Sequence, residues 1–172
     1  MTVTSQILLV EDDINLSFVL ADYLRNKEFQ VDLASNGQEA LSMLSMKKYD
    51  IILLDIMMPV MDGYELVRTI RESGMTMPVL MITAKGNFDD MREGFLSGTD
   101  DYMVKPVNVN EMVLRVSALL RRAQMISERK QRIGETLLEC DSMTVTCGGK
   151  SMILPQKEFN LLYKMAAYPG KI

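Results

Sequence analysis

Residues 49–63 read YDIILLDIMMPVMDG. The unbroken apolar run at 51–54 is typical of a parallel strand that is covered by helices on both faces. The run ends at an acid, Asp55, and Pro59 then breaks the chain before a helical pattern begins near Asp62. We therefore expect the carboxylate of Asp55 at the carboxyl end of a buried strand, the edge at which open α/β sheets bind their ligands.

The same alternation of apolar runs and helical patterns extends over the first part of the chain. Strands are expected at 6–10, 29–33, 49–55, 77–83 and 101–104, and helices near 14–25, 36–46, 62–71, 88–97 and 108–122. Asn36 with Glu39, and Asn108 with Glu111, have the spacing of capping boxes at two helix starts. Five βα units in series predict an α/β fold over residues 1–122, a doubly wound parallel sheet in the flavodoxin-like strand order.

Acidic residues also follow the first expected strand. Glu11, Asp12 and Asp13 come directly after residue 10, and Asp55 ends the third strand. One acid at a strand end is usually an ordinary loop residue, but several carboxylates at one edge raise each other's pKa unless a cation compensates. Mg²⁺ is a hard cation that binds one or two carboxylates together with water and phosphate oxygens. The sequence therefore predicts a Mg²⁺ site at this edge.

Two further strand ends supply a hydroxyl and an ammonium group. Thr83 ends the fourth expected strand, and Lys105 follows the fifth and precedes Pro106. Phosphoryl transfer to a carboxylate requires in-line positioning and charge neutralisation more than acid–base chemistry. Mg²⁺ and Lys105 would neutralise the phosphoryl oxygens, and Thr83 would hydrogen-bond one of them. The set is matched to a phosphoryl group on Asp55.

Four motifs, in this order, resemble those of response-regulator receiver domains. They are VED at 10–12, DIMMPVMDG at 55–63, TA at 83–84 and DDYMVKP at 100–106. The resemblance covers roughly residues 5–122 and implies that Asp55 is the phosphoacceptor. It also implies that Asp12, Asp55 and the backbone carbonyl of Met57 bind the metal. Glu11 would hold a metal-bound water.

The resemblance further implies a conformational switch and a cis peptide bond between Lys105 and Pro106. In the family, phosphorylation draws the Thr83 hydroxyl toward the phosphoryl group, and the ring of Tyr102 turns inward to fill the vacated space. The negative charge of the phosphoryl group thereby shifts the balance between two packing arrangements of these switch residues. On its own, Tyr102 would be interpreted as an ordinary edge-strand aromatic.

A signalling role rather than an enzymatic one follows from this family. A sensor histidine kinase would donate the phosphoryl group, and the usual output is control of transcription by a homodimer that forms on phosphorylation. The charges that resemble the dimer interface of winged-helix (OmpR/PhoB-type) regulators are Asp100, Asp101, Glu111, Arg115 and Arg122. In those regulators a basic residue pairs with the counterpart of Glu111, but here the position of that basic residue is Met91, with Arg92 beside it. The alternative to a dimer interface is that these charged residues form an ordinary solvated surface.

The pattern changes after residue 122. Residues 123–132 are polar and are interpreted as a helix tail and linker, and residues 133–172 resemble the start of a winged-helix effector domain, a partial α+β segment. Its expected elements are strands within 135–140, 143–147 and 151–154, followed by a helix at 155–167. Without the recognition helix and wing, specific DNA binding is expected only from the full winged-helix domain. About 40 residues form a small core, so we expect weak packing, domain swapping or self-association through Phe159, Leu162 and Met165.

Composition narrows the setting. Apolar residues make up 48% and charged residues 24% of the chain, as in ordinary globular proteins. The net charge of −4 argues against a protein that coats nucleic acid nonspecifically. No apolar run is long enough to span a membrane and no signal peptide is evident, so we expect a cytoplasmic protein without membrane association. Cys140 and Cys147 are expected to be reduced, and the absence of histidine excludes histidine-based catalysis.

Three alternative functions share some of these sequence features. A haloacid-dehalogenase-like phosphatase also uses an aspartyl nucleophile, but its loop normally has a second acid where this chain has Met57. A flavodoxin-like cofactor binder would need a Thr/Ser/Gly-rich phosphate loop, where this chain has Glu11-Asp12-Asp13. The third alternative is a receiver that dimerises or binds partners without accepting phosphate, because an acceptor set does not by itself demonstrate turnover.

Overall fold

The computed structural model describes residues 4–84, 86 and 88–167. The chain divides into two compact units, Met1–Leu120 and Arg121–Ile172. None of the helices in the described part of the chain combines the length and the apolar content that a membrane span requires.

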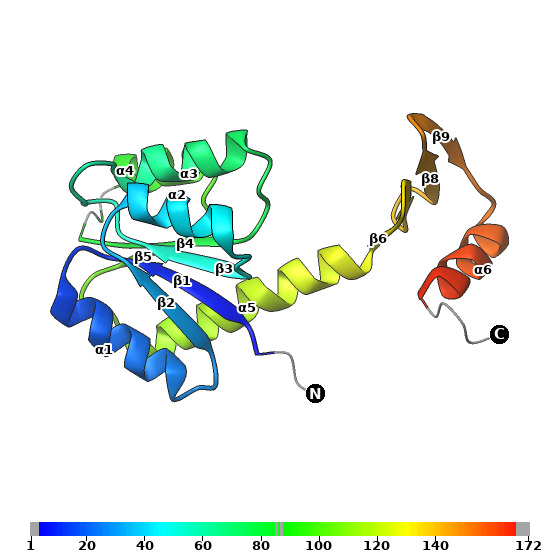
Figure 1. Ribbon diagram of the computed structural model, residues 1–172. Helices are drawn as coiled ribbons and strands as arrows, with labels where there is room; N and C mark the ends of the chain where they lie inside the picture. Colours follow the sequence, from blue (N-terminus) through cyan, green and yellow to red (C-terminus); the bar gives the residue numbers. More distant parts are fainter. Residues whose placement is uncertain (1–3, 85, 87, 168–172) are drawn as a thin grey trace. The chain divides into compact units, whose positions relative to one another are not determined.

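The first unit is built on a five-stranded sheet (Figure 1). Its strands are β1 (Gln6–Val10), β2 (Gln30–Ala34), β3 (Ile51–Leu54), β4 (Val79–Thr83) and β5 (Asp101–Val104). All neighbouring strands are parallel, and their order is β2-β1-β3-β4-β5. The flavodoxin-like order predicted from the sequence is confirmed. The order reverses between β1 and β3, which is the switch point where such sheets bind ligands.

Helices cover both faces of this sheet. They are α1 (Ile14–Arg25), α2 (Gly37–Met46), α3 (Gly63–Glu72), α4 (Phe88–Ser97) and α5 (Val109–Glu128). Successive strand residues point to opposite faces, so Ile52 and Leu54 join one core cluster with residues of α2 and α3. Ile51 and Leu53 join the other with residues of α1 and α5. Burial of the strands on both faces explains their continuous apolar sequence.

Two helix starts carry the expected caps, although the glutamates bond elsewhere. Asn36 accepts a hydrogen bond from the backbone N–H of Glu39, as in a capping box. The Glu39 carboxylate, however, accepts from the backbone N–H of Ser35, one residue earlier than a capping box requires. Asn108 likewise accepts from the N–H of Glu111, whose side chain binds Arg115 instead of returning to the cap.

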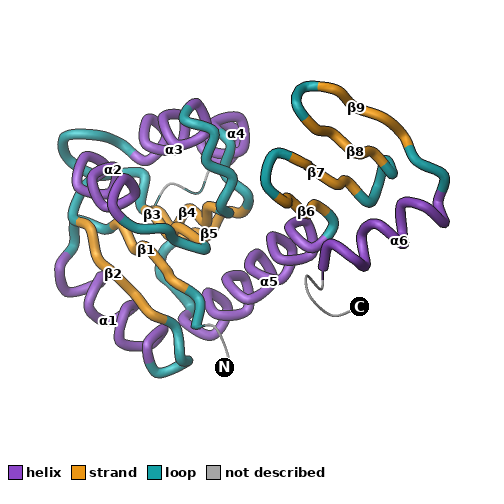
Figure 2. The backbone as a smooth tube through the Cα atoms, turned by 45° about the vertical axis from the view of Figure 1, so that its right-hand side comes forward, coloured by secondary structure: helices purple, strands orange, loops and turns teal. Residues whose placement is uncertain are grey.

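The second unit contains a four-stranded antiparallel sheet followed by a helix (Figure 2). Its elements are β6 (Lys130–Ile133), β7 (Thr136–Glu139), β8 (Thr144–Cys147), β9 (Lys150–Ile153) and α6 (Gln156–Ala167). Of the helix tail and linker expected at 123–132, the helix tail is present as the end of α5, whereas residues 130–132 belong to β6. The sequence of β6 does not alternate between apolar and polar residues. The strand is defined by its pairing with β7, in which Lys130 lies opposite Glu139 and forms a 2.8 Å ion pair with it. Sequence periodicity cannot show such a strand.

The core of the second unit is small. Among its described residues, Leu138 and Phe159 are the buried hydrophobic side chains, and the ring of Phe159 stacks on Tyr163. Leu162 and Met165, which were expected to share a face with Phe159, are exposed. Two buried side chains provide little hydrophobic stabilisation for a separate unit.

The loop between β3 and α3 contains a strained residue. Val60 has φ +72°, a backbone region that a β-branched side chain rarely adopts, and its side chain is 83% exposed. Because asparagine tolerates this region, we expect Val60→Asn to raise the free energy of unfolding by about 1 kcal/mol. Denaturant unfolding measures the change. Val19→Asn, at an exposed helical valine, is the control and should not stabilise; an equal response of the two variants would contradict strain at Val60.

Candidate functional site

Three carboxylates meet where β1 and β3 end. Val10 pairs with Leu54, so the residues that follow, Glu11 and Asp55, lie side by side. Oxygen atoms of Glu11, Asp12 and Asp55 all lie within 4.8 Å of one another. Glu11 and Asp55 are buried, whereas Asp12 is exposed. A cluster of hard oxygen atoms with one open side has the ligand chemistry that a divalent cation such as Mg²⁺ requires.

Lys105 reaches into this cluster from the end of β5. Its Nζ atom lies 2.7 Å from Oδ2 of Asp55 and 2.8 Å from Oε2 of Glu11. Its backbone N–H donates to the carbonyl of Thr83 at 2.8 Å, which joins the ends of β5 and β4. The peptide bond to Pro106 is cis, as the family resemblance implied. Glu11 also accepts from the backbone N–H of Asp13, so both of its carboxylate oxygens are engaged here.

The charges of the site do not balance. Burial raises the pKa of Glu11, and the hydrogen bonds from Lys105 and the Asp13 N–H oppose that rise. Burial alone would lower the pKa of Lys105, but its bonds to Asp55 and Glu11 outweigh this effect and the pKa is raised, so the ammonium is retained. One ammonium faces three carboxylates. A second cation would relieve the remaining repulsion.

The predicted switch residues lie on neighbouring strands. Thr83 ends β4 and is fully buried, and Tyr102 in β5 pairs with Met81. The ring of Tyr102 is 5% exposed, so it occupies an inward position. The structure thus brings Thr83 and Lys105 to the edge where Asp55 lies, and it places Tyr102 inside the core behind them.

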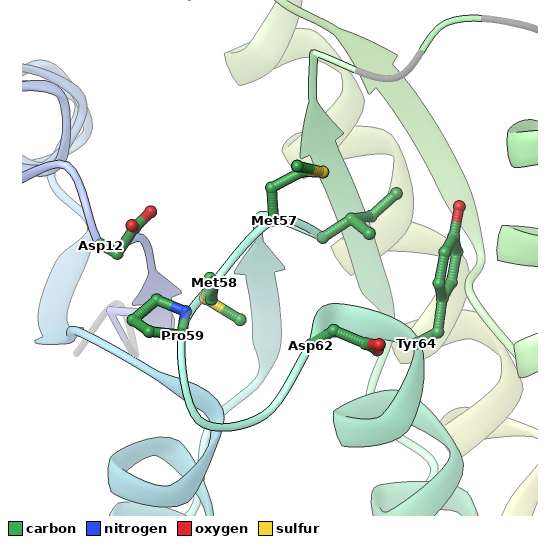
Figure 3. Close-up of a pocket in the computed structure, with 7 residues that line it drawn as sticks. Asp12, Met57, Met58, Pro59, Asp62 and Tyr64 are labelled. Atoms are coloured by element: carbon green, nitrogen blue, oxygen red, sulfur yellow. The ribbon is translucent and has the colours of Figure 1, made fainter.

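An open pocket of about 400 Å³ adjoins Asp12 (Figure 3). Its lining residues are Asp12, Ile56, Met57, Met58, Pro59, Asp62 and Tyr64. The backbone N–H of Met57 donates to Oδ1 of Asp55 at 3.1 Å, which helps to orient this carboxylate. Sequence reasoning identified Asp12 and Met57 but missed Tyr64. The only feature of the sequence that points to Tyr64 is its position directly after Asp62 and Gly63.

The residues predicted for a dimer interface are partly engaged within the chain. Arg115 donates to both oxygens of Asp101 and also bonds to Glu111. Asp100 forms an ion pair with Arg71 at 2.8 Å and accepts from a backbone N–H of β4. Arg122 is exposed and lies in α5 beyond the point at which the chain divides into its two units. An interface role for these five residues stays a prediction.

Fold and site together define an α/β domain with a carboxylate cluster at the carboxyl edge of its parallel sheet, where a divalent cation could bind. The family model of the response regulator receiver domain matches residues 7–117, and the chain belongs to this family. It is the receiver domain of a two-component response regulator, followed by a further segment.

Relatives and solved structures agree with this assignment. The heme response regulator HssR of Staphylococcus epidermidis is 39% identical over 165 residues, which cover 96% of this chain and 73% of the relative. The transcriptional regulatory protein ResD of Bacillus subtilis is 40% identical over 98% of this chain and 73% of its own length. The structure of the Francisella response regulator 1452 receiver domain matches with a TM-score of 0.67 and 30% identity, over 69% of this chain and 98% of that one.

Proposed function

We propose that the protein accepts a phosphoryl group on Asp55 from the phosphohistidine of a sensor histidine kinase. The observation that carries this proposal is the Asp55 carboxylate, which is buried at the end of β3, 2.7 Å from Nζ of Lys105 and within 4.8 Å of two other acids. In this arrangement Asp55 would be the nucleophile, and Lys105 together with a cation, when one is bound, would supply positive charge around the reacting centre.

The residues of the site have separate tasks in the transfer. An oxygen of Asp55 attacks phosphorus in line, the new O–P bond forms as the P–N bond to the kinase imidazole breaks, and an acyl phosphate results. Asp12, Asp55 and the carbonyl of Met57 would hold Mg²⁺, with Glu11 oriented toward its water. Bound Mg²⁺ would supply neutralisation of the phosphoryl charge. Lys105 and the Thr83 hydroxyl would contact the phosphoryl oxygens.

The output would pass through α4, β5 and α5. Movement of Thr83 and Tyr102 biases this face toward pairing with a second copy. Leu96, Val104 and Leu114, one on each of these elements, are exposed and would supply the apolar centre of the interface. Asp101, Glu111 and Arg115 are already close to one another and would exchange partners across it, together with Asp100 and Arg122. Each such exposed pair contributes little alone, so the network as a whole would set the association.

Transcription is the proposed endpoint. The names of HssR and ResD describe regulators, one of them of transcription. The sheet β6–β9 and helix α6 resemble the start of an OmpR/PhoB-type winged-helix domain. The described residues contain no helix after α6 that could enter a major groove. We therefore infer that residues 121–167 do not read a specific DNA sequence by themselves.

The test is intact-protein mass spectrometry after incubation with Mg²⁺ and acetyl phosphate. We expect one phosphate adduct on the parent and none on Asp55→Asn. The matched control is Asp62→Asn, which removes another carboxylate of the same region but keeps a residue able to cap α3; it should retain the adduct. Size-exclusion chromatography of the same samples tests dimerisation. A folded, Mg²⁺-binding parent without an adduct would favour the phosphate-independent receiver instead.

A further inference from the structure

Tyr64 lies between the carboxylate pocket and the switch residue. It is the second residue of α3, and it lines the pocket with Asp12 and Met57 (Figure 3). The side chain is nevertheless 4% exposed. Its hydroxyl donates a 2.9 Å hydrogen bond to the backbone carbonyl of Asp90, in the first turn of α4, and is hydrogen-bonded to the hydroxyl of Tyr102 on β5. One side chain therefore contacts both elements that are expected to move.

The backbone next to Tyr64 is held against the strand end that carries the phosphoacceptor. The N–H of Gly63 donates to the carbonyl of Ile56 at 3.0 Å. A Cβ atom added at Gly63 would lie 2.6 Å from the carbonyl oxygen of Asp55, so the two backbones are in direct contact. A shift of the chain at Asp55 is thereby passed to the first turn of α3 and to Tyr64. Closely packed groups transmit such shifts because they cannot deform continuously.

Tyr102 fits closely between the sheet and α4. A Cβ atom added at Gly94 would lie 3.1 Å from Cδ2 of the Tyr102 ring, which leaves no spare room on that side. Burial raises the pKa of Tyr64 and of Tyr102, so both hydroxyls keep their protons near neutral pH and both can donate. The inward ring is therefore held by a hydrogen-bonded pair within a tight apolar enclosure.

We propose that Tyr64 is a positioning residue of the switch, whose hydroxyl fixes the first turn of α4 and holds Tyr102 in its inward position. This inference rests on the proposed function, because it assigns Tyr64 to the same Thr83–Tyr102 switch. Tyr64 touches no reacting atom, and its effect is on the balance between two positions of the Tyr102 ring. Removing one hydrogen bond should shift that balance outward by about fivefold.

Fluorine NMR of the full chain labelled with 3-fluorotyrosine tests the proposal without any phosphodonor. The Tyr102 resonance is assigned with Tyr102→Phe. In Tyr64→Phe we expect it to move toward the position of exposed tyrosines and to gain sensitivity to H₂O/D₂O exchange. Tyr49→Phe is the matched control: Tyr49 is also buried and loses one hydroxyl bond, to Asp32. An unchanged Tyr102 in Tyr64→Phe, or an equal change in Tyr49→Phe, overturns the proposal.

Two further measurements separate a switch role from loosened packing. Mg²⁺ with beryllofluoride, a phosphoryl analogue, should return Tyr102 of Tyr64→Phe to the parent position, which it would not do for a merely disturbed core. Gly94→Ala should displace the ring from the other side, and the Tyr64 resonance should then shift with that of Tyr102. A Tyr64 resonance that does not shift when the Tyr102 ring is displaced would contradict the proposed coupling of Tyr64 to Tyr102. Failure of the proposed function would appear separately, as the absence of a phosphate adduct on the parent.

Discussion

Replacing Lys105 by methionine is expected to slow phosphate incorporation from acetyl phosphate by about 100-fold, even with saturating Mg²⁺. The ammonium lies 2.7 Å from Asp55, beside the place where the phosphoryl oxygens would carry negative charge during the transfer. Methionine keeps roughly the length of the side chain while removing the positive charge. The rate is measured as the growth of the adduct by intact-protein mass spectrometry.

The same substitution should change stability in a way that Mg²⁺ reverses. Without Mg²⁺, Lys105→Met leaves Glu11 and Asp55 buried beside each other with no ammonium, and the free energy of unfolding should fall by about 2 kcal/mol. This value is reduced from that of a fully buried pair because the Lys105 side chain is 21% exposed. Mg²⁺ should restore most of the stability, because a bound cation replaces the missing charge, but it should not restore the rate.

Lys47→Met provides the control for Lys105. Lys47 also bonds to an acid, Asp32, at 2.6 Å, but the two side chains are 43% and 36% exposed. An exposed ion pair contributes little, so neither the rate nor the response to Mg²⁺ should change. A folded Lys105→Met protein that is phosphorylated within a few-fold of the parent rate would show that Lys105 does not contact the phosphoryl group.

Much of the first unit could be predicted because its signals are local. Each apolar run such as Ile51–Leu54 reports a doubly covered strand, and the residue after each run lies at the ligand edge by the geometry of parallel sheets. The strand order and the gathering of Glu11, Asp55 and Lys105 follow from that rule together with the family motifs. The roles of these residues in phosphoryl transfer stay proposals.

The features that sequence reasoning missed depend on contacts between distant residues. Tyr64 is held in position by partners in α4 and β5, and hydrophobic periodicity along the sequence cannot predict such contacts. The ion pair of Asp100 with Arg71 of α3, which also donates to the carbonyl of Gly98 at 3.0 Å, was not expected either, and an interface role for Asp100 stays a prediction. Strand β6 forms because β7 pairs with it. Tertiary partners override local propensity at each of these places.

Gly63→Ala is expected to lower the free energy of unfolding by about 3 kcal/mol, because the added methyl group has no space. Its Cβ atom would lie 2.5 Å from Cδ1 of Leu54, 2.6 Å from the carbonyl oxygen of Asp55 and 2.8 Å from Cα of Ile56. Two of these three atoms belong to backbone, which cannot move aside as a flexible side chain can. Denaturant unfolding measures the loss, and the phosphate adduct should form more slowly in the folded fraction because the Asp55 backbone must shift.

Gly37→Ala separates this close approach from the general effect of alanine at a helix start. Gly37 is also the first residue of its helix and follows Asn36, a capping residue, as Gly63 follows Asp62. Its Cβ would meet Cγ and Sδ of Met61 at 2.8 and 2.9 Å, and a change of rotamer moves both atoms away. The third contact, with Cβ of Met61 at 3.0 Å, requires only a small shift. Alanine also has the higher helix propensity, so Gly37→Ala should change stability by no more than about 1 kcal/mol. Equal losses in the two variants would mean that the close approach to the backbone of Asp55 and Ile56 is not the reason that glycine is required at Gly63.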